Sequence, residues 1–201
     1  MEIFQDPWSA RGIGAFGTIV FVFIGAWGLL EQNRKIWKYR SGASVSIPMY
    51  IFFASFTATT WIYGHERGRI PLIVSGIVRG AAHIPILIGL WKFKSFTALD
   101  IALAFGLALA TVAMAFLPYK DVAYFLFSLG CMVISVMQPI EIWQKKDAGV
   151  VDVKLIIIYF LSSIFWTMYG FARDDWAIKY ISPEFLVIWI VTIVLWFKYR
   201  R

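Results

Sequence analysis

The chain has 201 residues, of which 60% are hydrophobic and 18% aromatic, and it carries a formal net charge of +7. Its mean hydropathy of +0.72 excludes a soluble globular domain and indicates a protein that lies in a lipid bilayer. The one cysteine, Cys131, excludes an intramolecular disulfide.

Apolar stretches long enough to cross about 30 Å of hydrocarbon, as helices that rise about 1.5 Å per residue, recur along the whole chain. They predict seven transmembrane helices, at about residues 13–33, 47–64, 70–91, 97–117, 121–143, 153–171 and 182–198. The first stretch lacks a basic leader and a small-residue cleavage site, so we expect a retained helix and not a signal peptide. Pro183 stands at the start of the last stretch, a position that proline tolerates in helices. The sequence therefore predicts an all-α, multi-pass integral membrane protein.

The chain also contains an internal duplication. Residues of the first half recur at a constant offset of 106: Gln32, Ile36, Trp37, Tyr63 and Gly64 return as Gln138, Ile142, Trp143, Tyr169 and Gly170. An odd number of spans with a duplication requires three helices, a linker and three helices, so the halves are parallel repeats. We expect a first repeat at residues 1–94, a linker helix at 95–119 and a second repeat at 120–201.

The positive charges predict the orientation, because loops rich in Lys and Arg stay on the cytoplasmic side. One side carries Arg34, Lys35, Lys38, Arg40, Lys92, Lys94, Lys145, Lys146, Lys154, Lys198, Arg200 and Arg201. The other side has half as many: Arg11, Arg67, Arg69, Lys120, Arg173 and Lys179. We therefore expect the N-terminus outside and the C-terminus in the cytoplasm. The basic loops also suit contact with anionic membrane lipid, and they do not require binding to nucleic acid.

Two loop segments and two helix segments carry a family resemblance. Residues 31–46, EQNRKIWKYRSGASVS, resemble the PQ-loop motif, in which Pro-Gln near a helix end precedes a basic loop and a Ser-rich segment. Residues 137–152 form a second, weaker copy. Residues 46–64, from Ser-Ile-Pro to Trp-Ile-Tyr-Gly, and residues 165–170, FWTMYG, look like the corresponding segments of SWEET sugar transporters. The chain thus resembles the PQ-loop, or MtN3/SWEET, superfamily over nearly its whole length.

The resemblance implies a bundle whose halves face one another across a central cavity that opens alternately to either side. SWEETs facilitate sugar diffusion, cystine-type PQ-loop carriers couple their substrate to protons, and KDEL receptors bind peptides on the same fold. We expect a transporter of a small polar solute, either a sugar or an anionic or zwitterionic metabolite. The alternatives are a receptor that binds a peptide or carboxylate without transport, and an inert member of a complex. An enzyme, a metal site and a cofactor are not expected, since the sequence has no nucleophile beside a base, no Cys or His cluster and no phosphate loop.

Prolines depart from the family pattern. Glu31 and Met137 stand where the motif has proline, and Pro139 arrives two residues late. Of the four prolines that serve as hinges in SWEETs, only Pro48 is in register. Proline in a helix frees a carbonyl and permits bending. Since Glu31 stands at the proline position, the first span has no proline hinge there, and glycines at 25 and 28 are candidates to replace it.

The expected sugar site departs further. SWEETs place an asparagine in the third helix of each half, whereas the one asparagine here, Asn33, lies in the predicted cytoplasmic loop region. The roughly corresponding positions hold Arg79 in the third span and Glu184 or Phe185 in the seventh. A sugar site of the standard design is therefore absent.

Arg79 is the strongest candidate to bind a solute. It lies roughly 15 Å from both ends of its span, where a charge costs at least ~2.5 kcal/mol and needs a partner or a watered cavity. His83, four residues on, shares its helical face and titrates near neutral pH, so the pair suits an anionic or zwitterionic solute. Alternatively, Arg79 is satisfied by backbone carbonyls or by Glu184 across the pseudo-twofold axis, and His83 by a neighbouring helix. Glu184 equally fits an N-terminal helix carboxylate, because it follows Pro183.

Aromatic residues predict an asymmetric cavity. Trp166 matches the family's cavity tryptophan in its spacing to Tyr169, and an aromatic face beside a polar group grips ring-shaped ligands. Thr60 holds the matching position in the first half, and Trp61 is displaced by one residue, which turns its side chain about 100° round the helix.

The expected gating residues are Gln32, Pro48, Tyr63, Gln138, Pro139 and Tyr169. The two glutamines lie one helical turn before an Ile-Trp pair. An amide there would bridge helices across a cytoplasmic gate, for about 0.6 kcal/mol each, or simply pack between them. The expected partners are a small polar solute and membrane lipid, and a homo-oligomer stays open.

Overall fold

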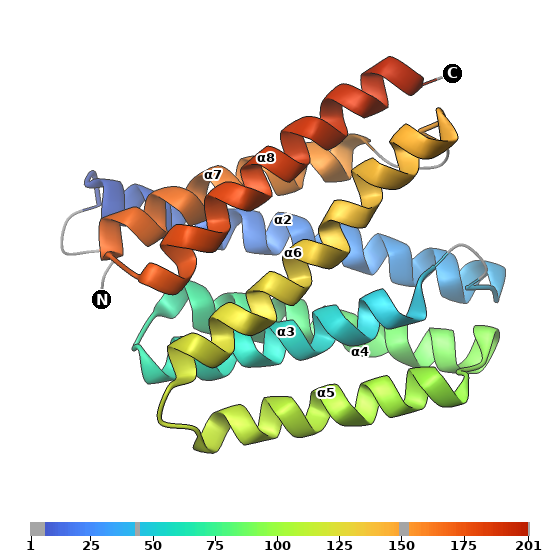
Figure 1. Ribbon diagram of the computed structural model, residues 1–201, viewed down its shortest axis with the longest axis horizontal. Coiled ribbons are helices and arrows are strands. Elements are labelled where there is room, and N and C mark those ends of the chain that lie inside the picture. Colours follow the sequence, from blue (N-terminus) through green and yellow to red (C-terminus); the bar gives the residue numbers. More distant parts are fainter. Residues whose placement is uncertain (1–6, 43–44, 149–152, 201) are drawn as a thin grey trace. The chain divides into compact units, whose positions relative to one another are not determined.

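The computed structural model describes residues 7–42, 45–148 and 153–200. Their regular elements are all α-helices: α2 (Ala10–Tyr39), α3 (Ile47–Glu66), α4 (Ile70–Lys94), α5 (Ala98–Phe116), α6 (Lys120–Lys145), α7 (Val153–Arg173) and α8 (Trp176–Tyr199) (Figure 1). Residues 43–44 of the first PQ-loop-like segment, residues 149–152 of the second, and Arg201 lie outside the described residues.

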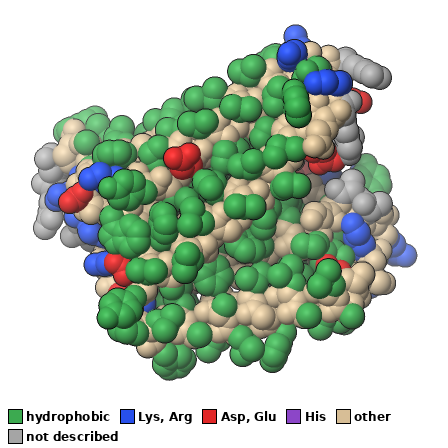
Figure 2. Space-filling model, in the orientation of Figure 1, with side chains coloured by type: hydrophobic (Ala, Val, Ile, Leu, Met, Phe, Trp, Pro, Cys, Tyr) green, Lys and Arg blue, Asp and Glu red, His purple; other side chains and the backbone are tan. Residues whose placement is uncertain are grey.

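Six of these helices are long and apolar enough to cross a bilayer: α2, α4, α5, α6, α7 and α8. α3 has a sufficient length of 20 residues but a lower hydropathy, because it carries Thr57, Thr59 and Thr60 as well as charged or polar groups at its end. On the face shown in Figure 2, hydrophobic side chains predominate, and Lys and Arg gather near helix ends. The predicted all-α, multi-pass integral membrane protein is thus confirmed, while its orientation stays a prediction.

The helix boundaries repeat with the offset of the sequence duplication. α3 begins at Ile47 and α7 at Val153, α4 begins at Ile70 and α8 at Trp176, and α2 ends at Tyr39 as α6 ends at Lys145. The next residues, Arg40 and Lys146, are both left-handed, with φ of 47° and 52°. A left-handed residue is a common way to end a helix, so both copies stop their first helix by the same backbone device.

The two helical hairpins, α3–α4 and α7–α8, also share one turn. The amide of Arg69 donates to the carbonyl of Gly64 at 2.8 Å, and the amide of Asp175 donates to that of Gly170 at 3.1 Å. A Cβ on Gly64 would lie 2.6 Å from Leu72 Cβ, and a Cβ on Gly170 would lie 2.9 Å from Ile178 Cγ2. Only glycine allows the helices to approach this closely, which explains why it recurs in the duplication.

The chain divides into two compact units. The central unit is Val22–Tyr124, and the terminal unit is Met1–Phe21 with Phe125–Arg201. In the central unit α3 packs on α4 and α5, and in the terminal unit α7 packs on α8. The central core joins α2, α3 and α4 through Leu29, Ile36, Ile47, Tyr50, Ile51, Ile86 and Leu90. These units divide α2 and α6 between them, and the three-one-three assignment of repeats stays a prediction.

Two predicted boundaries are wrong. α8 begins at Trp176 and not at 182, because Asp175 caps it by accepting a hydrogen bond from the Ile178 amide at 3.4 Å. Pro183 and Glu184 are therefore inside the helix, so the interpretation of Glu184 as an N-terminal carboxylate is also wrong. Helices in membranes tolerate an internal proline, because neighbouring groups satisfy the freed carbonyl.

The other boundary is the end of α2, which runs on to Tyr39. Asn33 and the basic residues at 34–38 are thus helical and do not form a loop. Glu, Gln, Arg and Lys are all good helix formers, and the ion pair between Glu31 and Arg34, one turn apart, supports the continuation.

The duplicated glycines give a test of the hairpin packing. We expect Gly64→Ala and Gly170→Ala each to destabilise the protein by about 1–3 kcal/mol, because a methyl group would overlap the facing helix. Gly106→Ala is the matched control: no atom lies within 4 Å of its Cβ position, so it should be neutral or stabilising by about 0.5–1 kcal/mol. Thermal unfolding of the purified protein measures all three, and equal melting temperatures would contradict the close approach.

Candidate functional site

In the central unit, α4 presents Arg79 and His83 to its two neighbours. The Arg79 guanidinium lies over Gly25 of α2, where a Cβ would be 3.3 Å from Nη2. His83 is only 4% exposed, and its Nδ1 lies 2.6 Å from the carbonyl oxygen of Arg79. Since a carbonyl can only accept, Nδ1 carries the proton of this bond, and Nε2 of a neutral ring is left as an acceptor.

The His83 ring packs against aromatic rings of α3. Its centroid lies 5.9 Å from that of Tyr50 and 6.5 Å from that of Phe53. Tyr159 and Trp189, which stand 106 residues after Phe53 and His83, make the equivalent contact between α7 and α8 at 5.2 Å. The two copies thus share a ring contact at this level, in which the imidazole of His83 in the first copy corresponds to the indole of Trp189 in the second.

The structure separates Thr60 from Trp61. Thr60 is buried, and its Oγ1 donates to the carbonyl of Phe56 at 2.7 Å. Trp61 is 46% exposed, and its backbone packs closely on Gly76 of α4. One of the two predicted contact residues thus faces the interior of the unit, and the other has an exposed ring.

In the terminal unit, Trp166 of α7 is half-buried and meets Tyr169 edge to face, with ring centroids 6.2 Å apart. Next to it, Thr167 Oγ1 is buried and makes no hydrogen bond to the described residues. Glu184 lies exposed on α8. Because Glu184 and Arg79 belong to different units, their pairing stays a prediction.

Tyr63 belongs to a cluster at the end of the central unit, which we term the central seam: Tyr63, Glu66, Arg67, Lys120, Asp121 and Tyr124. Tyr63 is 1% exposed, and its ring stacks on that of Tyr124 with centroids 4.4 Å apart and planes 8° from parallel. Two ion pairs cross beside the rings, Arg67 to Asp121 at 3.2 Å and Lys120 to Glu66 at 3.1 Å. The seam thus fastens the end of α3 to the start of α6.

Tyr169 belongs to an equivalent cluster in the terminal unit, which we term the terminal seam: Arg11, Gly14, Gly17, Phe21, Phe165 and Tyr169. A Cβ on Gly14 would lie 3.0 Å from the Tyr169 amide nitrogen, and Gly17 is covered by the Phe165 ring. Phe21 stacks on Phe165 at 5.4 Å, and Arg11 Nε donates to the carbonyl of Ala172 at 3.4 Å. The terminal seam thus fastens the start of α2 to the end of α7.

The other predicted gating residues lie toward the opposite helix ends. Gln32 and Gln138 are both half-buried, Pro48 is exposed in the first turn of α3, and Pro139 is buried inside α6. Near Gln32, the indole of Trp37 donates to the carbonyl of Pro85 at 3.1 Å, which ties α2 to α4. None of these contacts shows whether the residues gate a path, and their role stays a prediction.

Sequence reasoning missed the buried hydroxyl groups. Beyond Thr60 they are Thr18, Thr57, Thr59, Ser75, Ser128, Ser135, Ser162, Ser163, Ser182 and Thr192. Helical spacing could have found some of them: Ser128, Cys131 and Ser135 follow one face of α6, and Thr57 and Ser163 occupy equivalent positions of the two copies. These groups offer polar lining inside otherwise apolar helices.

Comparison with known proteins gives a family and a fold. Residues 122–201 match the family model MtN3_slv, described as "Sugar efflux transporter for intercellular exchange". The chain is similar in structure to a eukaryotic SWEET transporter, with a TM-score of 0.79 and 14% sequence identity over 94% of this chain and 96% of that chain. No curated protein matches the chain.

At 14% identity the structural comparison establishes the shared fold alone, and the family match covers the predicted second repeat. The family and the fold are both those of transporters, which are not enzymes. The second half of the chain is thus similar to the MtN3/SWEET family, and nearly the whole chain shares the fold of a SWEET transporter.

Proposed function

We propose that this protein transports a small polar solute, in the first instance a sugar, across the membrane by alternating access. The observation that carries the proposal is the match of residues 122–201 to a family of sugar efflux transporters, supported by the SWEET fold of nearly the whole chain. In the terminal unit, the half-buried Trp166 offers an aromatic face to a sugar ring, and the neighbouring Thr167 offers a buried hydroxyl group. In the central unit, Thr60 offers a buried hydroxyl oxygen.

Arg79 supports a second candidate solute, one that carries a carboxylate. A guanidinium presents a planar fork of donors that matches a carboxylate, and hydrogen bonds to charged groups are stronger than those between neutral groups. The side chain lies beside Gly25 of α2, which has no side chain to compete for the space. His83 supports its placement, because the bond from Nδ1 to the Arg79 carbonyl joins the two residues through one helical turn.

For the conformational cycle, we propose that each seam acts as a gate within its own unit, on the side predicted to be external. In each seam the first helix of one copy is fastened to the second helix of the other copy, by Tyr124 on Tyr63 and by Gly14 and Gly17 on α7. Each seam depends on one ring stack worth about 0.5–1.5 kcal/mol and on close packing, and the central seam also depends on partly exposed ion pairs worth about 0.2–1 kcal/mol each. Such a gate is stable enough to close and weak enough to open thermally.

Transport by reconstituted protein tests the function and separates it from a receptor. Proteoliposomes should accumulate a labelled neutral sugar or a labelled small carboxylate faster than protein-free liposomes, and excess unlabelled solute should compete. Binding of a solute or short peptide detected by thermal shift, without uptake of any solute, would contradict transport and favour the receptor.

Two substitutions test whether Arg79 binds the solute. Arg79→Met keeps the apolar stem, and Gly25→Leu puts a side chain where the guanidinium lies. If Arg79 binds a carboxylate solute, both variants should lower the affinity for that solute roughly 10-fold or more, because a hydrogen bond to a charged group is worth about 1.5–3 kcal/mol. Gly106→Leu, in an open part of α5, is the control. An unchanged affinity for the carboxylate solute, together with a lower melting temperature, would show that Arg79 has a structural role alone.

Tyr124 tests the gate. The reporter is the single thiol of a Thr60→Cys, Cys131→Ser protein, labelled by a membrane-impermeant thiol reagent added outside. Adding Tyr124→Ala should raise the labelling rate of this thiol roughly 2- to 12-fold, because the lost ring stack is worth about 0.5–1.5 kcal/mol. Leu126→Ala, a 61% exposed position two residues further along the same helix, is the matched control. Equal labelling rates in the two variants would show that the central seam does not act as a gate.

A further inference from the structure

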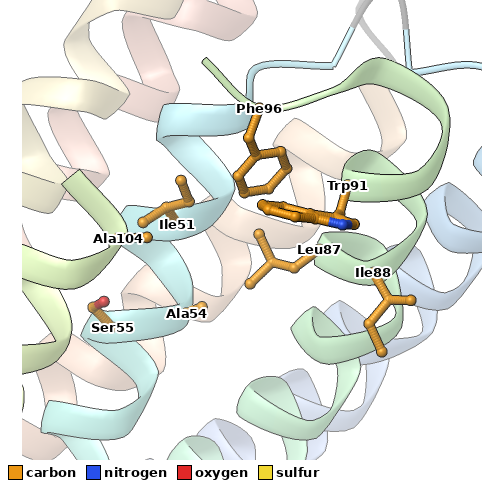
Figure 3. Close-up of a pocket in the computed structure, with 8 residues that line it drawn as sticks. All are labelled: Ile51, Ala54, Ser55, Leu87, Ile88, Trp91, Phe96 and Ala104. Carbon is orange, nitrogen blue, oxygen red and sulfur yellow. The ribbon is translucent and has the colours of Figure 1, made fainter. Parts of the chain in front are cut away.

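The central unit holds a pocket that lies apart from the residues discussed so far. Its volume is about 370 Å³, and it opens between α3, α4 and α5 (Figure 3). The lining includes Ile51 and Ser55 of α3, Leu87 and Trp91 of α4, Ala104 of α5, and Phe96 just before α5. Figure 3 shows the Phe96 ring over the Trp91 indole at one end of the pocket, and their centroids are 5.1 Å apart.

The pocket exists because of the linker helix. α3 and α4 pack closely at their shared turn, where Gly64 meets Leu72 and Gly76 meets Trp61. Toward the other end they are bridged by α5, which offers only the small side chain of Ala104 to the space. α5 stands between the two copies and has no counterpart in either, so the duplication does not supply the same covered pocket to α7 and α8.

The lining determines which chemistry fits. Apart from Ser55 its residues are apolar, and an apolar cavity of this kind does not hold water. A dry cavity of about 150 Å³ accommodates benzene, so this pocket has room for on the order of a dozen carbon atoms. Trp91 is 60% and Ile88 is 53% exposed, so one wall is continuous with the surface that faces lipid. A flexible hydrocarbon chain from the bilayer fits both the size and the opening.

The charges at this end of the central unit select the headgroup. Lys92 and Lys94 follow Trp91 in the last turn of α4, and Lys38 and Arg40 end α2, whose Trp37 packs on Phe93 at 5.4 Å. Lys92 Nζ lies over the Trp37 and Phe93 rings, and Lys94 Nζ donates to the carbonyl of Val45 at 2.7 Å. The Lys92 ammonium keeps donors for a ligand, since a lysine has three and contacts with ring faces use none as a conventional hydrogen bond.

The acidic groups at the same end are already engaged. Asp100 accepts hydrogen bonds from the amide and hydroxyl of Thr97, at 2.9 and 2.7 Å, and so caps α5. Glu31 pairs with Arg34. Asp100 keeps its negative charge beside Lys94, but the four basic residues Lys38, Arg40, Lys92 and Lys94 outnumber it, so this end of the unit is cationic. Each Lys or Arg near a membrane surface attracts anionic lipid by about 1 kcal/mol.

We propose that this pocket is a binding site for an anionic phospholipid, with one acyl chain inserted beneath Trp91 and Phe96 and the phosphate held by Lys92. A lipid bound here would join α4 to the linker helix and so stabilise the central unit. The proposal does not depend on the transported solute, because the pocket uses none of the residues assigned to the solute or the gate.

Melting temperatures of the purified protein test the site. We compare phosphatidylglycerol with phosphatidylcholine of the same acyl chains, added to detergent-solubilised protein. Phosphatidylglycerol at 100 times its Kd should raise the melting temperature by about 5–10 °C, and phosphatidylcholine by less. Leu87→Trp fills the pocket and should abolish both shifts, whereas Ile193→Trp, at the equivalent position of α8, should keep them. Lys92→Gln should reduce the difference between the two lipids.

Two outcomes would overturn the proposal. Equal shifts of the melting temperature with both lipids in the wild type would show that the site does not select an anionic headgroup. A wild-type shift in Leu87→Trp would show that the lipid does not bind in this pocket. If Leu87→Trp is unstable, Ala104→Leu is a smaller filling substitution to read in its place. Quenching of Trp91 by lipids with brominated chains, taken as the difference from Trp91→Phe, gives a measurement independent of stability; no preference for brominated phosphatidylglycerol would also refute the site.

Discussion

Hydrocarbon offers no hydrogen-bond partner, and this constraint governs both the backbone and the polar side chains of the protein. The backbone responds by forming helices throughout the described residues. Polar side chains respond in the same local way: Thr57, Ser163, Thr192 and His83 each bond a carbonyl three or four residues earlier in their own helix. Because these groups are satisfied within one helix, they do not fix a helix to its neighbour. A shift of one helix against its neighbour would leave these four hydrogen bonds intact.

Contacts between helices depend instead on glycine and on rings. Gly64 and Gly170 let the hairpins close, and the shared turns at Arg40 and Lys146 end the first helix of each copy. These positions recur because both copies need the same backbone geometry. The middle of the third helix of each copy has no such requirement. There, at the 106-residue offset, Arg79 corresponds to Phe185 and His83 corresponds to Trp189. Duplication thus preserves the scaffold, while the candidate site becomes asymmetric.

The sequence predicts most of the scaffold and only part of the site. Hydropathy and the 106-residue offset give the helical class and the starts of α3, α4 and α7 at residues 47, 70 and 153. Hydropathy misplaces the start of α8, because Pro183 suits either the first turn of a helix or a position inside it. It also misplaces the end of α2, because this helix continues past its apolar run into charged residues. The i, i+4 spacing places Arg79 and His83 on one face, but no spacing identifies Gly25, Tyr50 and Phe53 as their neighbours. Those contacts arise from packing between distant segments.

The linker helix follows a different rule from the repeats. α5 buries only Asp100 and Met114, so most of its apolar surface serves contact with lipid and not with protein. A helix held so lightly needs other support, and its capping box, in which Thr97 and Asp100 bond each other's backbone groups, fixes its first turn. The space between this turn and α4 is where the apolar pocket lies. A bilayer component that fills it would add the packing that the sequence of α5 does not supply, so the stability of the central unit would depend on the composition of the membrane around it.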